Sequence, residues 1–266
     1  YSSAASDVYK RQDLVTPPIN CWNKQGHGEI EIREAIEQSC NYYFNMVGFK
    51  LGQDADGNFS ENRSLSVLQK YASEIGLDKK TGIEITESAP HVSDSYAVPS
   101  YIGQGTNAYT TSQLARYATA IATSGNVYDL TLLDRQTDSK GNTLKKYEPD
   151  IINTVDVSQN VWDDIHDGMY RVVQTHRQFD GLGVDVAGKT GTAEVNVYHP
   201  NHGMFVGYAP ASDPEYAIAV RIENGYASGN ACLAADDIFK YIFELTDEKS
   251  ILTGVAASDT SDTSND

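Results

Sequence analysis

The segment Lys-Thr-Gly-Thr at residues 189–192 combines residue types that can bind the anionic end of a peptide. It lies within an apolar and β-branched stretch, residues 184–197, that predicts a strand. On a strand, Thr190 and Thr192 point to one face, where their hydroxyls can bind a carboxylate together. Lys189 supplies positive charge, which favours anionic groups and lowers the pKa of a neighbouring hydroxyl. Gly191 lets a substrate lie against the backbone of an edge strand. For the tetrapeptide alone, an ordinary strand with a β-bulge is the alternative.

A second candidate is Ser39-Cys40-Asn41, which interrupts a helical pattern of apolar residues over 31–50. Because Ser and Asn cap helices well, we expect one helix to end near Gln38 and another to start at Ser39. Alone, Ser-x-Asn is explained by capping. Together with Lys-Thr-Gly downstream, it completes two of the three elements found in penicillin-binding proteins and related β-lactamases.

The His and Cys residues do not predict a metal site. His199 and His202 flank a Pro-Asn pair, which favours a hairpin turn without a third ligand near in sequence. The chain has three cysteines, too few for a disulfide scaffold, although Cys21 and Cys40 could pair and leave Cys232 over. We predict no metal and no cofactor.

Composition excludes several classes of function. The 266 residues include 37 acidic and 20 basic side chains, a net charge of −17. Such a chain is unsuited to nucleic acid or to an anionic membrane surface, because both bind proteins through basic groups. No apolar run approaches the roughly 20 residues of a membrane span. With 40% hydrophobic residues, the chain can bury a core.

The elements that must position these motifs follow from hydrophobic spacing. Helices are predicted over 31–50, 66–75, 110–125 and 160–175, then strands over 184–197, 203–209 and 216–222, then a last helix. That helix, 231–245, is expected to face inward with Ala234, Ile238, Tyr241, Ile242 and Leu245. Helices followed by a strand meander indicate an α+β fold.

Both ends of the chain are set apart from the predicted domain. Residues 1–12 have no apolar period and are interpreted as a non-native segment. Residues 251–266 are small, polar and acidic, which predicts a disordered tail. The domain is therefore expected to span residues 13–250.

Longer blocks around the two motifs resemble the transpeptidase domain of class B penicillin-binding proteins, elongation-type enzymes of Firmicutes in particular. The blocks include AIEQSCNYYF at 35–44, YIGQGT at 101–106 and VAGKTGTAE at 186–194, in the family's order. The resemblance implies the β-lactamase/transpeptidase-like fold, an antiparallel sheet flanked by helices. It also implies a serine acyltransferase that acts on the D-Ala-D-Ala end of peptidoglycan stem peptides and is acylated by β-lactams.

The resemblance assigns a role to each matched residue. Ser39 would relay a proton to the leaving amine, and Lys189 would hold its hydroxyl. The Asn41 amide would bind the substrate backbone. Thr190 and Thr192 would hold the terminal carboxylate, and the Thr192 N–H would supply half of the oxyanion hole. The family further implies a place on the extracytoplasmic face of the bacterial membrane, an N-terminal anchor and a membrane glycan polymerase as partner.

One departure from the family pattern concerns the nucleophile. The family's nucleophilic serine lies in Ser-x-x-Lys upstream of Ser-x-Asn, and no serine of this chain has a lysine three residues later. We therefore expect a truncated domain, without the nucleophile helix and the first strands of the sheet. A class D-like β-lactamase or a D,D-carboxypeptidase would share the motifs. A non-catalytic penicillin-binding sensor or scaffold module is the alternative outside enzymes, and a substituted upstream serine would indicate it.

This departure predicts that the 266-residue chain, made alone, is inactive and poorly folded, because a helix and several strands would be lacking from its core. Thermal unfolding and acylation by labelled penicillin measure both properties. A cooperative unfolding transition together with full acylation would contradict the prediction.

Overall fold

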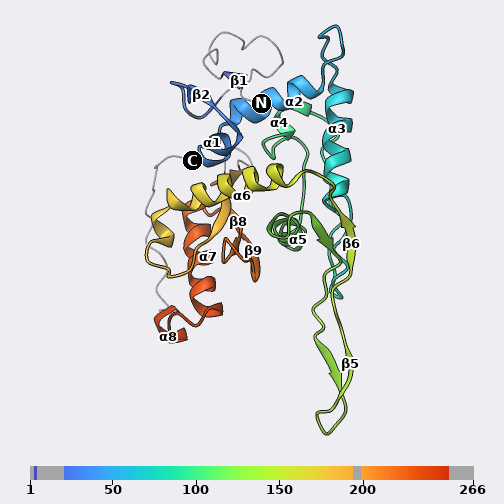
Figure 1. Cartoon of the computed structure of the whole chain (residues 1–266), viewed down its shortest axis with the longest axis vertical. Helices are drawn as coiled ribbons and strands as arrows, with labels where there is room; N and C mark the ends of the chain where they lie inside the picture. Colours follow the sequence, from blue (N-terminus) through green and yellow to red (C-terminus); the bar gives the residue numbers. More distant parts are fainter. Residues whose placement is uncertain (1–2, 5–20, 194–198, 252–266) are drawn as a thin grey trace.

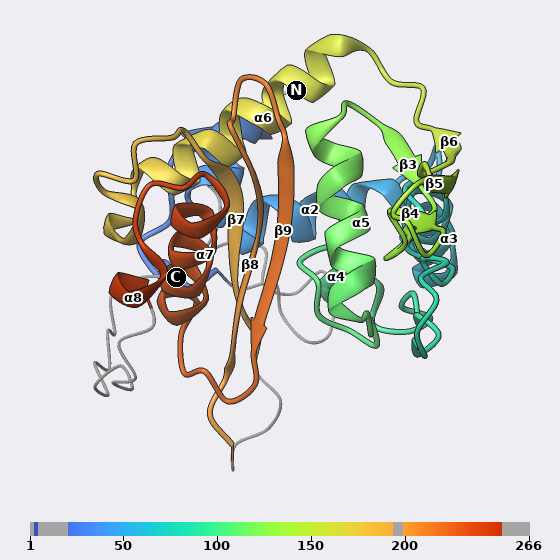
Figure 2. The same cartoon turned by 90° about the horizontal axis from the view of Figure 1, so that it is seen from below.

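The computed structural model describes residues 3–4, 21–193 and 199–251. At its centre lies an antiparallel sheet in the order β7-β8-β9, formed by Ala187–Ala193, His202–Ala209 and Tyr216–Ile222 (Figure 2). Lys189 pairs with Val206 and Thr192 with Gly203. The predicted meander is confirmed. Its first strand begins at Ala187 rather than at residue 184, and residues 194–197 of that prediction lie outside the described part.

Helices precede and follow the sheet, as predicted. They are α1 Ile32–Glu37, α2 Asn41–Leu51, α3 Glu61–Glu74, α4 Ala97–Ser100, α5 Thr111–Ala122, α6 Gln159–Gln174, the 3-10 turn η2 Arg177–Phe179, α7 Ser228–Ile242 and α8 Glu248–Ile251. Helix α3 begins five residues before the predicted start, because Ser60 caps it by accepting from the Arg63 N–H. Helix α5 begins at the capping box of Thr110 and Gln113, where the sequence pattern predicts one.

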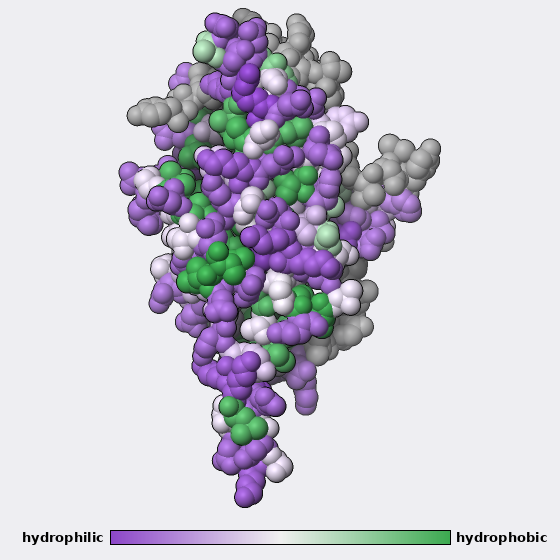
Figure 3. Space-filling model, turned by 90° about the vertical axis from the view of Figure 1, so that its right-hand side faces the viewer, coloured by the Kyte–Doolittle hydropathy of each residue, from purple (hydrophilic) through white to green (hydrophobic). Residues whose placement is uncertain are grey.

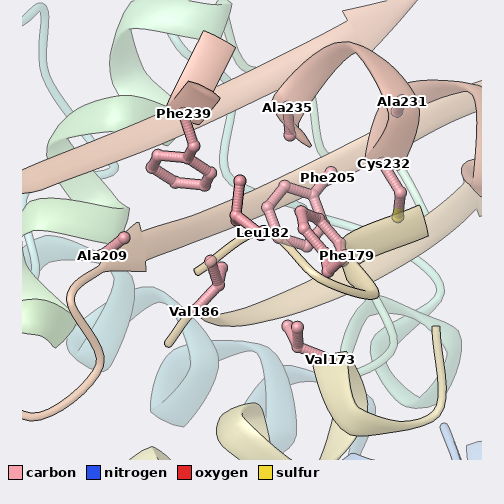
Figure 4. Close-up of a cluster of buried hydrophobic side chains, with 10 residues drawn as sticks. All are labelled: Val173, Phe179, Leu182, Val186, Phe205, Ala209, Ala231, Cys232, Ala235 and Phe239. Carbon is pink, nitrogen blue, oxygen red and sulfur yellow. The ribbon is translucent and has the colours of Figure 1, made fainter. Parts of the chain in front are cut away.

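The two faces of the sheet are covered by different helices (Figures 1 and 2). Strand alternation turns Phe205 and Ala209 of β8 toward α7, whereas Tyr208 turns toward α5 and α6. Figure 4 shows the cluster on the α7 side, where Phe205 and Phe239 are fully buried among residues from η2, the loop before β7 and α7. The two faces together enclose the core and hold β7 in place.

The predicted inward face of α7 is wrong by about one residue. Ile238, Tyr241 and Leu245 are among the exposed large apolar residues, while the α7 residues packed in the cluster on the sheet are Ala231, Cys232, Ala235 and Phe239. Small side chains let the helix approach β8 closely, and Phe239 then fills the space between them. Hydrophobicity alone favoured the predicted stripe of α7, because the apolar side chains on that stripe are larger.

A narrow arm between α5 and α6 was not predicted. It contains two antiparallel pairs, β3 Asn126–Tyr128 with β6 Ile151–Thr154, and β4 Arg135–Thr137 with β5 Thr143–Lys146. It projects away from the body of the molecule in Figure 1. The strands are short and mostly exposed, so they lack the apolar alternation that marks a strand in sequence. Figure 3 shows the face that carries this arm as mainly hydrophilic, with separate small apolar patches.

Near the N-terminus, β1 Ser3–Ala4 pairs with β2 Glu29–Ile30 in a short antiparallel ladder. This places two residues of the segment interpreted as non-native beside the predicted domain. Within the described residues, no helix has both the length and the apolar character that crossing a membrane requires. Of residues 251–266, predicted to be a disordered tail, Ile251 is the last residue of α8, and residues 252–266 lie outside the described part.

Packing around β8 predicts the size of one stability change. Phe205→Ala should lower the free energy of unfolding by about 3–5 kcal/mol, because it removes a fully buried ring between α7 and β7. Leu144→Ala, in the exposed arm, should change it by less than about 0.5 kcal/mol. Urea unfolding of the product of the complete reading frame that contains this sequence measures both. Equal losses would contradict the described core.

Candidate active site

Strand β7 presents the Lys-Thr-Gly-Thr segment from a position fixed by close backbone packing. A Cβ at Gly188 would overlap the Phe205 ring, and one at Gly207 would come within 2.6 Å of the Ala187 carbonyl oxygen. Gly191 differs, because the nearest atom to a Cβ built there is the Met204 Cβ, at an ordinary 3.6 Å. Packing therefore requires glycine at 188 but not at 191. The predicted role of Gly191, to keep space for a substrate along the backbone, stays a prediction.

The Ser39-Cys40-Asn41 segment forms a tight turn between two helices. Helix α1 ends at its cap Gln38, Ser39 has a left-handed backbone with φ of 48°, and Cys40 is the extended N-cap of α2. The predicted junction is confirmed, although α2 starts at Asn41 rather than at Ser39. A left-handed serine costs about 1–2 kcal/mol, so surrounding contacts must hold it.

Two contacts hold this turn. The Trp22 indole Nε1–H donates to the carbonyl oxygens of Gln38 and Ser39, both at 3.1 Å. The Cys40 N–H donates to the Ala35 carbonyl at 2.9 Å, and the Cys40 side chain is fully buried beside α2. The backbone around Ser39 is therefore anchored on both sides.

Helix α6 connects the turn to the sheet. Arg33 of α1 pairs with Asp164 at 2.6 Å, and Arg171 of α6 pairs with Glu34 at 3.1 Å. Gly168 brings the helices close, since a Cβ there would lie 2.9 Å from the Ile36 Cβ. The same helix packs on the sheet face around Tyr208. The turn and β7 thus share one rigid support.

This support brings Lys189 and Ser39 together across 150 positions of sequence. The Lys189 Nζ donates to the Ser39 Oγ at 2.5 Å and to the Thr190 carbonyl oxygen at 2.8 Å. An ammonium that donates to a hydroxyl oxygen leaves the hydroxyl hydrogen available to a third group. The pair can therefore pass a proton to a leaving amine.

The threonines lie on β7 beside this pair. Thr190 is 8% exposed, and its Oγ1 is 3.4 Å from the Lys189 Nζ. The Thr192 Oγ1 accepts from the Ser228 N–H at 3.3 Å, at the N-terminal end of α7. A helix N-terminus and an ammonium both favour negative charge. Asn41 is the first residue of α2 and is half-buried, and its predicted contact with substrate stays a prediction.

A profile for the penicillin-binding protein transpeptidase domain matches residues 4–244. The chain belongs to this family. Among curated proteins, it is 32% identical over 231 residues to penicillin-binding protein 2B of Streptococcus pneumoniae D39, covering 76% of this chain and 34% of the relative. It is 28% identical over 257 residues to the peptidoglycan D,D-transpeptidase MrdA of Acinetobacter baumannii, covering 83% and 35%.

Solved structures of the same family have a similar fold. Penicillin-binding protein 2B of S. pneumoniae R6 matches with a TM-score of 0.73 and 26% identity, covering 87% of this chain and 42% of that one. The D,D-transpeptidase domain from Eggerthella lenta matches with a TM-score of 0.71 at 24% identity, over 85% and 56%. The β-lactamase/transpeptidase-like, α+β fold is thereby confirmed. The chain spans about a third of the length of the curated relatives it matches.

Next to this candidate site the structure gathers a group of three residues, of which the sequence offered only a possible pair of Cys21 with Cys40 and no metal site. Cys21, His27 and Cys40 place their sulfur and nitrogen atoms within 4.8 Å of one another, and the Cys21 Sγ lies 3.7 Å from the His27 Nδ1. Among the described residues, this group has the composition and spacing that could hold a metal ion. His202, weighed at the sequence level, instead contacts Arg221 at 2.9 Å and accepts from the Asn224 N–H.

Electrostatics distinguish the two thiols. The pKa of the Cys21 thiol is lowered to about 5, mainly because it accepts a hydrogen bond from the Cys40 thiol. Burial of Cys21 acts in the opposite direction. The same contact and burial raise the pKa of Cys40. The sequence offered Cys21 and Cys40 only as a possible pair, and it gave no signal that His27, six residues after Cys21, would join them.

The anchored turn predicts the effect of Trp22→Phe. The variant removes the indole donor, and the forked hydrogen bond from its single N–H, worth about 0.5–1.5 kcal/mol, is lost from the Ser39 turn. Amide hydrogen exchange across residues 38–41 should become at least about twofold faster in the complete protein. Exchange in α7 should not change, and unchanged exchange at the turn would contradict its anchoring by Trp22.

Proposed function

We propose that this chain supplies the proton-relay and carboxylate-binding part of a serine D,D-transpeptidase, which cross-links peptidoglycan stem peptides and is acylated by β-lactams. The observation that carries the proposal is the 2.5 Å contact between the Lys189 Nζ and the Ser39 Oγ. It joins the two family motifs present in the sequence. Membership of the transpeptidase domain family supports the same reaction class.

Proton transfer is the first task of the site. A serine of the Ser-x-x-Lys motif, which this sequence does not contain, attacks the carbonyl of the penultimate D-Ala. The bond to the terminal D-Ala breaks, and its nitrogen takes a proton through the Ser39 hydroxyl. Lys189 holds that hydroxyl by donating to its oxygen. The acyl group then passes to an amine of a second stem peptide.

Recognition of the peptide end is the second task. Thr190 and Thr192 lie two residues apart on β7, so both face the terminal carboxylate, whose charge Lys189 complements. Gly191 leaves the strand open to the substrate backbone. The Thr192 N–H provides half of the oxyanion hole, and the Asn41 amide binds the substrate backbone.

The substrate indicates where the protein acts. Peptidoglycan is assembled outside the cytoplasm, so the domain works on the extracytoplasmic face of the bacterial membrane, held there by an N-terminal anchor. A membrane glycan polymerase, which supplies strands to be cross-linked, is the partner that fits this role.

The proposal predicts that Lys189→Met slows acylation by labelled penicillin about 100-fold or more in the product of the complete reading frame, because the proton relay loses its support. Lys50→Met, at an exposed lysine of α2, is the matched control and should retain the parental rate. The unfolding midpoints of both variants show whether the fold is intact.

Two results would overturn the proposal. Acylation of a folded Lys189→Met variant at the parental rate would remove Lys189 from the reaction. A parental protein that penicillin never acylates would instead support a non-catalytic scaffold module.

A further inference from the structure

Helix α2 has a polar face that starts at the Ser39 turn. Asn41, Asn45, Gly48 and Gly52 follow one another at spacings of four, three and four residues, so they share one side of the helix. The large apolar residues of α2 lie on its other sides and pack in a buried cluster. The polar face therefore continues from the Ser-x-Asn motif along the helix.

Aromatic rings from other elements cover the half of this face that carries the glycines. A Cβ at Gly48 would overlap the Tyr101 ring, and a Cβ at Gly52 would overlap the Phe59 ring. The Tyr101 hydroxyl donates to the Ser64 carbonyl oxygen at 2.9 Å, and the Ser64 hydroxyl donates to the Gly48 carbonyl oxygen at 2.8 Å. The polar groups that meet this half of the face are thus paired.

Asn45, one turn before Gly48, is different. The residue is 5% exposed, and its amide oxygen Oδ1 is buried without a hydrogen-bond partner among the described residues. A polar atom withdrawn from water without a partner is destabilising, and folded proteins almost always supply one. An apolar side chain would suit a site without a donor better. Asn45 therefore indicates a donor outside the described residues.

The proposed reaction brings a further element to this face. The attacked carbonyl lies between the nucleophilic serine and the Ser39 hydroxyl, which Lys189 holds. The segment that carries this serine must therefore reach the turn where α2 begins, since proton transfers need heavy atoms about 2.6–3.2 Å apart. Asn45 lies only about 6 Å along the helix axis from Asn41. The part of that segment one turn beyond its serine then lies beside the Asn45 amide.

We propose that Asn45 is a positioning residue for the nucleophilic serine. Its amide oxygen accepts a hydrogen bond from an N–H or O–H donor on the segment that carries Ser-x-x-Lys. This bond fixes the segment against α2 and so sets the distance between the attacking oxygen and the pair of Ser39 and Lys189. The role rests on the proposed function, because only a nucleophilic serine links this hydrogen bond to acylation.

Two variants of Asn45 in the product of the complete reading frame test the role. Asn45→Leu keeps the size of the side chain without its polar atoms, whereas Asn45→Asp keeps an acceptor oxygen at the same place. Acylation by labelled penicillin is resolved into the dissociation constant of the first complex and the rate of the acylation step. Asn45→Leu should slow the acylation step about tenfold and leave the dissociation constant within about twofold, because the carboxylate-binding groups are unchanged. Asn45→Asp should recover the rate to within about threefold of the parental value.

Asn62→Leu is the matched control, at an exposed asparagine in the first turn of α3, and should change neither quantity. The unfolding midpoint gives a second readout of the same hydrogen bond. If a donor meets the amide oxygen, Asn45→Leu should lower the midpoint and Asn45→Asp should restore most of it. If no donor meets it, Asn45→Leu should raise the midpoint, because a buried unpaired polar group is removed.

Three results would overturn the proposal. They are a parental acylation rate in Asn45→Leu, an unfolding midpoint of Asn45→Leu at or above the parental one, and equal slowing of acylation by both variants of Asn45. A parental protein that penicillin never acylates would overturn the proposed function instead. The midpoints of the two variants would then decide alone whether the Asn45 amide has a donor.

Discussion

The contact between the Lys189 ammonium and the Ser39 hydroxyl is the interaction on which the rest of the site depends. Its two partners lie 150 positions apart in the sequence, and a shift of either by about an ångström would break it. Helix α6 prevents this shift, because it is ion-paired to α1 through Arg33 and Arg171 and also packs on the central sheet. Helix α6 therefore keeps Ser39 and Lys189 within hydrogen-bond distance of each other.

Local sequence signals predicted the parts whose structure local chemistry decides. The capping box at Thr110 starts α5, the Ser-Cys-Asn segment separates α1 from α2, and period-two alternation defines β8 and β9. The family motifs also indicated that Ser39 and Lys189 belong to one site. Their separation of 150 positions means that no local pattern could have placed them in contact.

The features that sequence patterns missed depend on distant contacts. Helix α7 turns Ala231, Ala235 and Phe239 to the sheet because close approach to β8 outweighs the larger apolar side chains on its other face. The convergence of Cys21 and Cys40 with His27, of which the sequence offered only a possible pair of the two cysteines, is likewise tertiary. It requires the turn at Ser39, whose left-handed backbone no residue type in that segment demands.

A double-mutant cycle for acylation by labelled penicillin tests the central claim most directly. It compares Ser39→Ala, Lys189→Met and the double variant in the product of the complete reading frame. If the two groups act as one proton relay, the double variant should lose little more rate than Lys189→Met alone, because residues that act as a unit are strongly non-additive. Losses that multiply would contradict the account, since they would mean that Ser39 and Lys189 contribute independently.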